Sequence, residues 1–388
     1  MTAGLGEVFT VALRLGLTSF GGPIAHLGFF RDEYVTRRGW VTDEAYSEIV
    51  ALCQVLPGPA SSQVGFAIGW TQRRLAGALA AFAGFTLPSA VVLAAFGALV
   101  GSADIAEATW LKALKIVAVA VVLDAVLGMG RRLAATAATA TVAVATFTVI
   151  VLVPSPVVQV AALLAAGIVG VWLFAGASPA GPSELPLQVS RRVGLATLVL
   201  LGVLLAALPL LASTGLLAQL AAIHFRAGAL VFGGGHVVLP LLEEAVVPDL
   251  MDTSTFLAGY GMAQAVPGPL FTFASYLGQV IAGPAGAVVS TVFIFLPGFL
   301  LLLGVLPFWS LVRSNTAMQA ALVGVNAAVV GVLAAALYDP IIVTTLLGPV
   351  EVVMAAALFA SLHFWRVPPW AVVLAAVLAS PLLEVLAR

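Results

Sequence analysis

The chain contains few charged residues and one cysteine, and these shortages exclude several classes of protein. Only 9% of its 388 residues are Asp, Glu, Lys or Arg, whereas an average soluble domain has about 25%. Cys53 stands alone, which excludes an internal disulfide and any metal site built from several thiolates. The His-Glu-x-x-His, Gly-x-Ser-x-Gly and Gly-Lys-Ser/Thr sequences of metalloproteases, serine hydrolases and ATP-binding loops are absent. Because these motifs are missing, we expect no enzyme activity, cofactor or metal site. The net charge is −1, and the basic residues occur in pairs between apolar runs, a pattern that indicates membrane orientation rather than a nucleic-acid partner.

Long hydrophobic runs fill the chain instead. Hydrophobic residues make up 62% of it, in runs of about 18 to 25 residues, which is the length of helix that crosses roughly 30 Å of hydrocarbon. A membrane β-barrel would have shorter, alternating segments. Residues 1–12 include Glu7 and lack a basic leader with a small-residue cleavage site, so we expect no removable signal peptide. The predicted fold class is therefore an all-α integral membrane protein.

Thirteen apolar segments divide the chain into two halves joined by one extra span. Residues 1–176 form the first repeat, residues 177–213 a Pro/Gly/Ser linker with one connecting transmembrane helix, and residues 214–388 the second repeat. The segments run over about 8–29, 47–71, 75–100, 112–130, 133–153, 156–176, 193–213, 215–240, 254–281, 284–309, 317–337, 340–363 and 367–386. Because seven segments precede the second repeat, it enters the membrane from the opposite side, and the repeats are predicted to be inverted.

A motif rich in Gly and Pro occurs once in each repeat. Arg-x5-Phe-Gly-Gly is followed about 35 residues later by Gln-x-x-Pro-Gly-Pro, and then by Leu-Pro. The first copy comprises Arg14, Phe20, Gly21, Gly22, Gln54, Pro57, Gly58, Pro59, Leu87 and Pro88. The second copy comprises Arg226, Phe232, Gly233, Gly234, Gln264, Pro267, Gly268, Pro269, Leu296 and Pro297. Apolar segments interrupted by Gly and Pro at equivalent places are typical of secondary transporters, in which the binding site lies where broken helices meet.

Basic residues between the segments predict the orientation in the membrane. Thirteen full spans would put Arg31, Arg37 and Arg38 outside and the acidic loop 243–252 inside, and both placements violate the positive-inside rule. Re-entrant hairpins in the first two segments of each repeat, turning at Gly-Gly and at Pro-Gly-Pro, correct both loops. We therefore favour about nine full spans and four hairpins over thirteen spans, with the amino terminus cytoplasmic and the carboxyl terminus outside. In both arrangements the arginines at 73–74, 131–132, 191–192, 313 and 366 fall on the cytoplasmic side.

The breaks in the helices predict an anion site. Pro-Gly-Pro ends one helix, and Pro59, like Pro23, suits the first turn of the next. The unpaired amides of such a helix start favour an anion. Ser61 and Ser62, with Thr272 at the place of Ser62 in the second repeat, would add hydroxyl groups there. A plain proline kink is the alternative interpretation.

Polar residues near the breaks are further candidates for binding. Arg14 and Arg226 each lie six residues before a Phe-Gly-Gly, and their planar guanidinium groups could together neutralise a divalent oxyanion. Alternatively, each arginine reaches the membrane interface or binds backbone carbonyls. Gln54 and Gln264 precede each Pro-Gly-Pro by three residues and either donate hydrogen bonds to the anion or bridge helices.

Four titratable residues are candidates for proton coupling. Asp124 is the only acid in the span 112–130, and its counterpart in the second repeat is apolar. It is either a proton carrier or a structural hydrogen-bond partner. His26, His236 and Glu243 follow the Gly-Gly breaks and could titrate during transport. If their loops are wet, they are solvated surface groups instead.

The paired motifs resemble a known family. Residues 19–23 (Ser-Phe-Gly-Gly-Pro) and 54–59 (Gln-Val-Leu-Pro-Gly-Pro), with the second Phe-Gly-Gly and Pro-Gly-Pro set, are similar to the two-domain (long-chain) chromate ion transporters. The resemblance covers about the whole chain. It implies a bacterial inner-membrane protein that exports chromate with the proton motive force, with sulfate as a look-alike substrate. Gly235 in place of Pro23, and Ala263 opposite Cys53, put equal roles for the two copies in question.

Other functions fit part of this pattern. An importer or exchanger of sulfate or another tetrahedral oxyanion would use the same site, because sulfate and chromate share charge and shape. An anion channel would need a continuous polar pore, which the scarcity of charge inside the spans disfavours. An intramembrane enzyme would need a nucleophile–base pair, which the sequence does not offer. The expected partners are the oxyanion and the lipid bilayer, and a homodimer is left open.

Overall fold

The computed structural model describes residues 3–20, 22–102, 109–174, 185, 187–232 and 235–386, and all regular structure within these ranges is helical. The chain forms two compact units, each assembled from three stretches that come from both repeats. Unit 1 comprises residues 1–98, 180–235 and 266–314, and unit 2 comprises residues 99–179, 236–265 and 315–388. The compact units therefore do not follow the repeats, and the domain limits drawn from the sequence stay a prediction.

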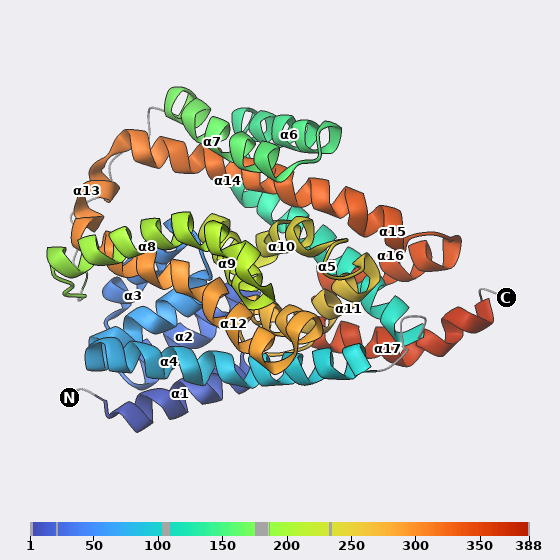
Figure 1. Ribbon diagram of the computed structural model, residues 1–388, viewed down its shortest axis with the longest axis horizontal. Helices are drawn as coiled ribbons and strands as arrows, with labels where there is room; N and C mark the ends of the chain where they lie inside the picture. Colours follow the sequence, from blue (N-terminus) through green and yellow to red (C-terminus); the bar gives the residue numbers. More distant parts are fainter. Residues whose placement is uncertain are drawn as a thin grey trace. The chain divides into compact units, whose positions relative to one another are not determined.

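Figure 1 labels the helices in chain order. Unit 1 holds α1 (Leu5–Thr18), α2 (Gly22–Phe30), η1 (Arg31–Arg37), α3 (Asp43–Val55), most of α4 (Ala60–Ser102), α8 (Arg191–Leu211), η2 (Ala212–Thr214), α9 (Leu216–Leu230), η4 (Leu270–Thr272), α12 (Phe273–Val305), η5 (Leu306–Phe308) and α13 (Trp309–Ser314). Unit 2 holds α5 (Thr109–Leu133), α6 (Ala137–Leu152), α7 (Pro156–Leu173), α10 (Val238–Val246), α11 (Thr253–Ala263), α14 (Thr316–Ala336), η6 (Leu337–Ile342), α15 (Val343–Thr345), α16 (Pro349–His363) and α17 (Pro369–Leu386). The short η3 (Gly235–Val237) lies where the chain passes from unit 1 to unit 2.

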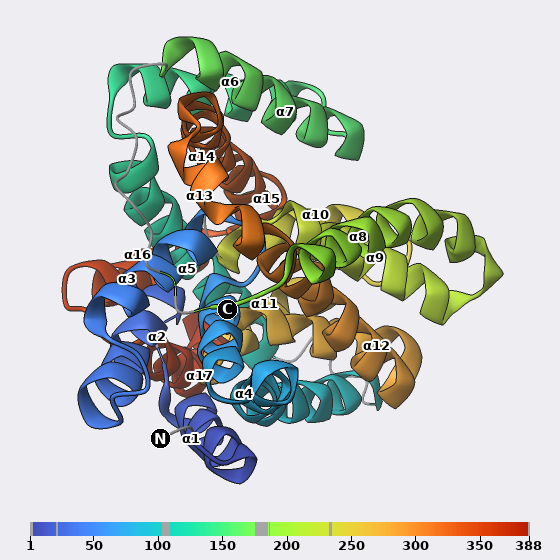
Figure 2. The same ribbon diagram turned by 90° about the vertical axis from the view of Figure 1, so that its left-hand side faces the viewer.

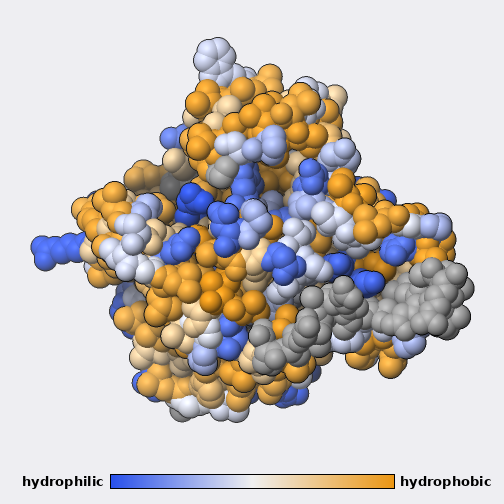
Figure 3. All heavy atoms as spheres, turned by 45° about the vertical axis from the view of Figure 1, so that its right-hand side comes forward, coloured by the Kyte–Doolittle hydropathy of each residue, from blue (hydrophilic) through white to orange (hydrophobic). Residues whose placement is uncertain are grey.

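Helices that are long enough to cross a bilayer expose hydrophobic side chains on the surface of the protein. In the described ranges five such helices occur, at Ala60–Val100, Trp110–Leu133, Arg191–Thr214, Leu270–Leu311 and Thr316–Thr345. Along α8, for example, Leu195, Val199 and Leu210 expose more than half of their surface. The face drawn in Figure 3 is largely hydrophobic, with hydrophilic side chains in smaller groups between. Such surface suits lipid rather than water, and the predicted class, an all-α multi-pass membrane protein, is confirmed.

Two of these helices contain a reversal of the chain at equivalent positions. In α4 the backbone leaves helical geometry at Arg73 and Arg74, and in α12 at Ala282 and Gly283. A methyl group on Gly69 would collide with the carbonyl of Gly77, although eight residues of straight helix would separate them by roughly 12 Å. The two parts of α4 therefore run antiparallel, and so do those of α12, where Gly278 and Gly286 make the same contact. This agrees with the predicted separation of segments near residues 72–74 and 282–283.

The first repeat contains the two predicted hairpins. The amino end of α1 lies at the reversal of α4, where the Ala3 amide donates to Gln72 Oε1 at 3.1 Å. The loop after η1 lies at the same end, since Gln72 Nε2 donates to the Trp40 carbonyl at 3.4 Å. The chain thus runs to the break near Ser19, returns to Trp40, runs to Pro-Gly-Pro and returns to Gln72. Thirteen full spans would put Trp40 and Gln72 at opposite ends, so the structure favours hairpins in this repeat.

Glycines allow close helix contacts in both units. In unit 1, α1 packs on the second part of α4, where a methyl group on Gly16 would lie 2.6 Å from the Phe85 carbonyl oxygen. At the equivalent place α9 packs on the second part of α12 through Gly228 and Ile294. In unit 2, α6 and α7 lie side by side along α14, as Figure 2 shows, and Gly324 of α14 meets the backbone of Ala166. Small residues at helix interfaces are the usual means of association in membranes.

Candidate functional site

The breaks of the two repeats are joined by reciprocal backbone hydrogen bonds in unit 1. The Gly58 amide donates to the Val231 carbonyl at 2.7 Å, and the Gly268 amide donates to the Ser19 carbonyl at 3.0 Å. Ser19 and Val231 each precede a Phe-Gly-Gly, and Gly58 and Gly268 are the central residues of Pro-Gly-Pro. The Pro-Gly-Pro turn of each repeat is therefore bound to the other repeat's break. The sequence predicts such convergence only in general terms, because the pairing depends on the tertiary fold.

Glycine is required at the centre of each Pro-Gly-Pro. Gly58 has φ 117° and Gly268 has φ 100°, a region that other residues rarely adopt. A methyl group on Gly58 would lie 3.0 Å from Gly298 Cα, and one on Gly268 would lie 2.9 Å from Ser89 Oγ. Ser89 and Gly298 each follow a Leu-Pro, so the third landmark of each repeat contacts the Pro-Gly-Pro of the other.

A buried polar cluster lies at the start of α4. The first amide to join the helical ladder is that of Gln63, which donates to the Pro59 carbonyl at 2.9 Å and leaves the amides of residues 60–62 ahead of it. Ser61 and Ser62 are in this first turn and are 3% and 2% exposed. His26, from α2, is 1% exposed, and its Nδ1 lies 3.3 Å from Ser61 Oγ. Its ring also makes a hydrogen bond with the backbone of Ser19.

Several polar atoms in this region are buried without a hydrogen-bond partner among the described residues. They are Ser19 Oγ, Ser62 Oγ and Gln63 Oε1. The Gln63 amide nitrogen is occupied, since it donates to the carbonyls of Pro57 at 3.1 Å and Gly298 at 2.9 Å. An unsatisfied buried polar atom costs about 1–3 kcal/mol, so these atoms are natural partners for a polar ligand. Ser19 and Gln63 were not predicted as site residues, although Ser19 lies beside the motif.

The start of α12 in the second repeat differs from that of α4. Thr272 is 1% exposed, and its Oγ1 donates to the Pro269 carbonyl at 2.7 Å. Phe271 and Phe273 flank it and are buried. Three residues of 3₁₀ helix, Leu270–Thr272, precede α12, whereas α4 begins directly after Pro59.

The predicted arginines are not part of the buried cluster. Arg14 and Arg226 are both exposed, as is Gln54. Gln264 is half-buried, and its Nε2 has no hydrogen-bond partner among the described residues. Of the other predicted site residues, Phe20, Phe232, Pro57 and Pro267 are half-buried, and Pro59 and Pro269 are buried. Gly22 and Pro23 begin α2 as predicted, while Gly21, Gly233 and Gly234 lie outside the described residues.

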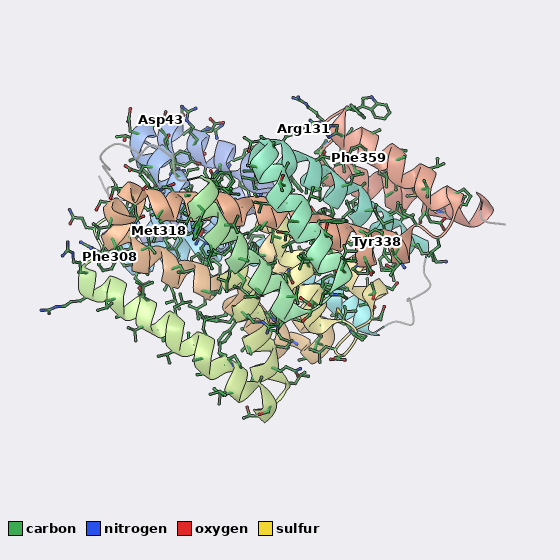
Figure 4. All side chains as sticks on the ribbon, turned by 90° about the horizontal axis from the view of Figure 1, so that it is seen from above. Asp43, Arg131, Phe308, Met318, Tyr338 and Phe359 are labelled. Carbon is green, nitrogen blue, oxygen red and sulfur yellow. The ribbon has the colours of Figure 1, made fainter. Side chains whose placement is uncertain are left out.

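Unit 2 contains a second polar group of residues around Asp124. Asp124 Oδ1 lies 2.8 Å from His363 Nδ1, at the end of α16, and its side chain is 41% exposed. Arg131 Nη2 lies 3.3 Å from the other ring nitrogen of His363. Because a guanidinium only donates, that nitrogen accepts and Nδ1 carries the proton that is donated to Asp124. Figure 4 labels Arg131 on α5 and Phe359 on α16, and the Phe359 ring stacks on His363 with centroids 5.2 Å apart.

The remaining proton-coupling candidates also lie in unit 2, apart from His26. His236 Nδ1 lies 2.7 Å from the hydroxyl oxygen of Tyr260, which is fully buried. Glu243 is 6% exposed, and its Oε1 has no hydrogen-bond partner within the part of the chain that the structure describes. Glu243 is therefore not a solvated surface group, and His236 is half-buried. His363 was missed by the sequence reasoning, because it belongs to no repeated motif.

Comparison with known proteins gives one consistent family. The chromate transporter family model matches residues 6–171 and 218–380. The chromate transport protein of Pseudomonas aeruginosa is 30% identical, over 93% of this chain and 87% of that protein. The chromate transport protein of Cupriavidus metallidurans is 29% identical, over 84% of this chain and 79% of its own. The probable chromate transport protein of Synechococcus elongatus is 28% identical, over 84% and 81%.

No solved structure matches the chain. The family model matches both halves of the sequence, at the segments that carry the repeated motif. This is the family that the motifs resemble, and the chain belongs to the chromate transporter family.

Proposed function

We propose that the protein is a secondary active transporter that exports chromate across a bacterial inner membrane and binds the dianion at the start of α4. One observation carries the location: a buried helix start with an unpartnered Ser62 hydroxyl, among the described residues, beside the joined breaks of both repeats. A dianion enters a low-dielectric interior only where hydrogen-bond donors replace its hydration. Amides and the dipole of a helix start, together with Ser61 and Ser62, provide such donors. Sulfate, with the same charge and shape, is the expected competitor.

Flux measurements on purified protein in liposomes test this function. With chromate inside and a pH gradient imposed, we expect protein-dependent chromate efflux that stops when the gradient is collapsed, and sulfate should inhibit it. Empty liposomes are the control for leak. Chromate flux that ignores the gradient and has no saturation would indicate an anion channel, and uptake driven in the opposite direction would indicate an importer.

Asp124 is proposed as the proton-coupling residue, together with its partner His363. The proposal is supported by their contact of 2.8 Å and by the 41% exposure of the carboxylate, which gives protons access. Asp124→Asn should abolish chromate flux driven by a pH gradient and leave chromate binding intact, because an amide cannot carry the proton that a carboxyl group carries. Driven flux at the wild-type rate in this variant would make Asp124 structural. His363→Gln is the companion variant and should slow driven flux less.

Arg14 and Arg226 are proposed to attract the dianion towards the breaks. Both are exposed and occupy equivalent positions before each Phe-Gly-Gly, so long-range attraction explains them better than contact inside the buried cluster. Arg14→Gln should lower the rate of transport at low chromate concentration, and Arg14→Lys should largely preserve it, since lysine keeps the charge. The same order is expected at Arg226. Equal transport rates in both glutamine variants and the wild type would show that the two arginines have no role in transport.

The orientation is proposed from the charges at one end of unit 1. Arg73 Nε donates to the Ala3 carbonyl at 2.8 Å, and Arg74 Nη1 donates to the Gln188 carbonyl at 2.9 Å, just before Arg191. Basic residues at this end suit the cytoplasmic side. In a Cys53→Ser background, the variants Thr36→Cys and Arg74→Cys should be labelled from the same, cytoplasmic side. Labelling from opposite sides would restore the model of thirteen full spans.

A further inference from the structure

We infer that the transporter holds one oxyanion at a time, in a half-site made by the first repeat alone, and that the equivalent positions of the second repeat are packed and bind no anion. The half-site consists of Ser61 and Ser62 at the start of α4, with His26 and Ser19 beside them. The inference rests on the proposed function. It goes beyond it, because a duplicated motif by itself predicts two equal half-sites.

The second repeat lacks the polar side chains of the first. Aligning the two motifs pairs Ser19 with Val231, His26 with Val238, Ser61 with Phe271, Ser62 with Thr272, Gln63 with Phe273 and Thr86 with Phe295. Only the pair of Ser62 and Thr272 keeps a hydroxyl group on both sides. Each of the other polar residues in these pairs is aligned with an apolar residue of the second repeat. The backbone frame is therefore duplicated, whereas the polar side chains at the helix start are, apart from Thr272, confined to the first repeat. Gln54 and Gln264, three residues before each Pro-Gly-Pro, are common to both repeats.

The one hydroxyl group that both repeats keep is used differently. Thr272 Oγ1 donates to the carbonyl oxygen of Pro269, three residues before it at the start of α12, at 2.7 Å. Ser62 Oγ has no hydrogen-bond partner among the residues that the structure describes, although the residue is 2% exposed. A hydroxyl carries a single proton, so Thr272 can donate to an anion only by giving up its existing bond. Ser62 donates without that loss.

Aromatic rings fill the space around the start of α12. The centroids of Phe271 and Phe295 are 5.8 Å apart, and those of Phe273 and Tyr276 are 5.9 Å apart. All four side chains are at most 2% exposed. Replacing the hydration of a dianion by phenylalanine rings is strongly unfavourable. At the start of α4, rings of Phe30 and Phe85 are also present, and the His26 ring packs on them with centroids 6.5 Å and 5.4 Å apart. There, however, the polar edge of the His26 imidazole meets the helix start, since Nδ1 lies 3.3 Å from Ser61 Oγ.

Calorimetry on the purified full-length protein tests the inference with sodium chromate and sodium sulfate as probes. The wild-type titration should give one anion per chain. Ser62→Ala should raise the dissociation constant by about tenfold or more, because a hydrogen bond to a charged group is lost. Thr272→Ala, its matched variant in the second repeat, should change it by less than about twofold. Ser62→Thr restores the hydroxyl and should bind within a few-fold of wild type.

The outcomes separate this inference from the proposed function. Two anions per chain, or a loss in Thr272→Ala as large as that in Ser62→Ala, would overturn the asymmetric half-site while leaving an oxyanion transporter. Wild-type protein that neither binds nor transports chromate or sulfate would overturn the proposed function itself. Wild-type stoichiometry does not depend on any variant, so the inference stays testable even if one of the substitutions prevents folding.

Discussion

In the first repeat the chain reverses at Arg73 and Arg74, and in the second it reverses at Ala282 and Gly283 with similar backbone angles. Arg74 has φ 50° and ψ −140°, and Gly283 has φ 65° and ψ −158°. The helix breaks of the two repeats are equally similar in geometry. The glycine of each Pro-Gly-Pro has a positive φ, and its amide donates to a backbone carbonyl of the other repeat. Side chains at the same places differ in size, charge and polarity. Duplication has thus preserved the path of the backbone more strictly than the chemistry placed on it.

The difference has a physical cause. Where chains cross closely, the backbone itself makes the contact, and a change there displaces two helices at once. Side chains that point into a binding site are free of this restraint. If each repeat bound a dianion of its own, two dianions would lie in one low-dielectric body, and their repulsion would oppose binding. A single polar half-site avoids that repulsion and still uses the duplicated frame.

The largest effect that separates the repeats is expected at the Pro-Gly-Pro glycines. Gly58→Ala should lower stability by about 2–5 kcal/mol, because alanine is strained at this φ and its methyl group would press on the backbone of Gly298 at 3.0 Å. Gly268→Ala should cost less, since the nearest atom is Ser89 Oγ, the end of a side chain that rotates, and the nearest backbone atom, the Phe85 carbonyl oxygen, is farther away at 3.3 Å. Thermal unfolding in detergent measures both. Equal losses would mean that strain alone, without the contact, sets the cost.

A smaller effect is expected at the two reversals. Gly283→Ala should destabilise the protein by about 1–3 kcal/mol through backbone strain, because the space around it is open. Arg74→Gly should stabilise it, since glycine relieves the same strain, although the hydrogen bond from Arg74 to the Gln188 carbonyl is lost. Melting temperatures of the two variants should therefore shift in opposite directions. A drop in both would show that the Arg74 contact outweighs the strain.

The smallest effect is expected at two equivalent helix caps and depends on pH. Thr42 caps α3 by accepting from the Ala45 amide at 3.2 Å, and Asp252 caps α11 by accepting from the Thr255 amide at 2.9 Å. Burial acts to raise the pKa of Asp252, but hydrogen bonds from Thr255 and nearby amides outweigh it and lower the pKa overall. The stabilisation by Asp252 is then complete above the ordinary aspartate pKa of about 3.9 and is lost as the pH falls through the lowered value.

Hydrogen exchange at the two helix starts measures this difference. Acidification from pH 6 to pH 3 should weaken protection at the start of α11 by up to about 0.5–2 kcal/mol, the usual value of a cap, and leave α3 unchanged in this respect. Asp252→Thr, which copies the cap of the first repeat, should remove the pH dependence. If α11 in that variant still opens on acidification, another group is responsible.

Much of the fold could be predicted from the sequence because it depends on local properties. The apolar runs predicted where the helices lie, and each Pro-Gly-Pro sequence predicted where a helix ends. The reversal near Arg73 was predicted from the charge pair that interrupts two apolar runs. The hairpins of the first repeat followed from the sides on which Arg31, Arg37 and Arg38 had to lie, and the contacts of Gln72 agree with them.

The candidate site was predicted less completely. Ser61 and Ser62 were expected from their place after Pro59, and both lie in the buried cluster. The burial of Gln63, and the lack of a hydrogen-bond partner for Ser19 Oγ among the described residues, depend on which helices pack against these two residues. The pairing of Asp124 with His363 joins residues 239 apart in the chain, and no spacing rule predicts such a contact.

The sequence by itself determined the membrane class, the duplication, the places where helices break and the family. These properties follow from composition and from the local geometry of Gly and Pro. Only the tertiary structure decided that each Pro-Gly-Pro binds the other repeat's break, that Ser62 is unpartnered among the described residues while Thr272 bonds Pro269, and that Arg14 and Arg226 remain exposed. The reason is that hydrogen bonds and burial across distant segments depend on packing, which residue order along the chain does not specify.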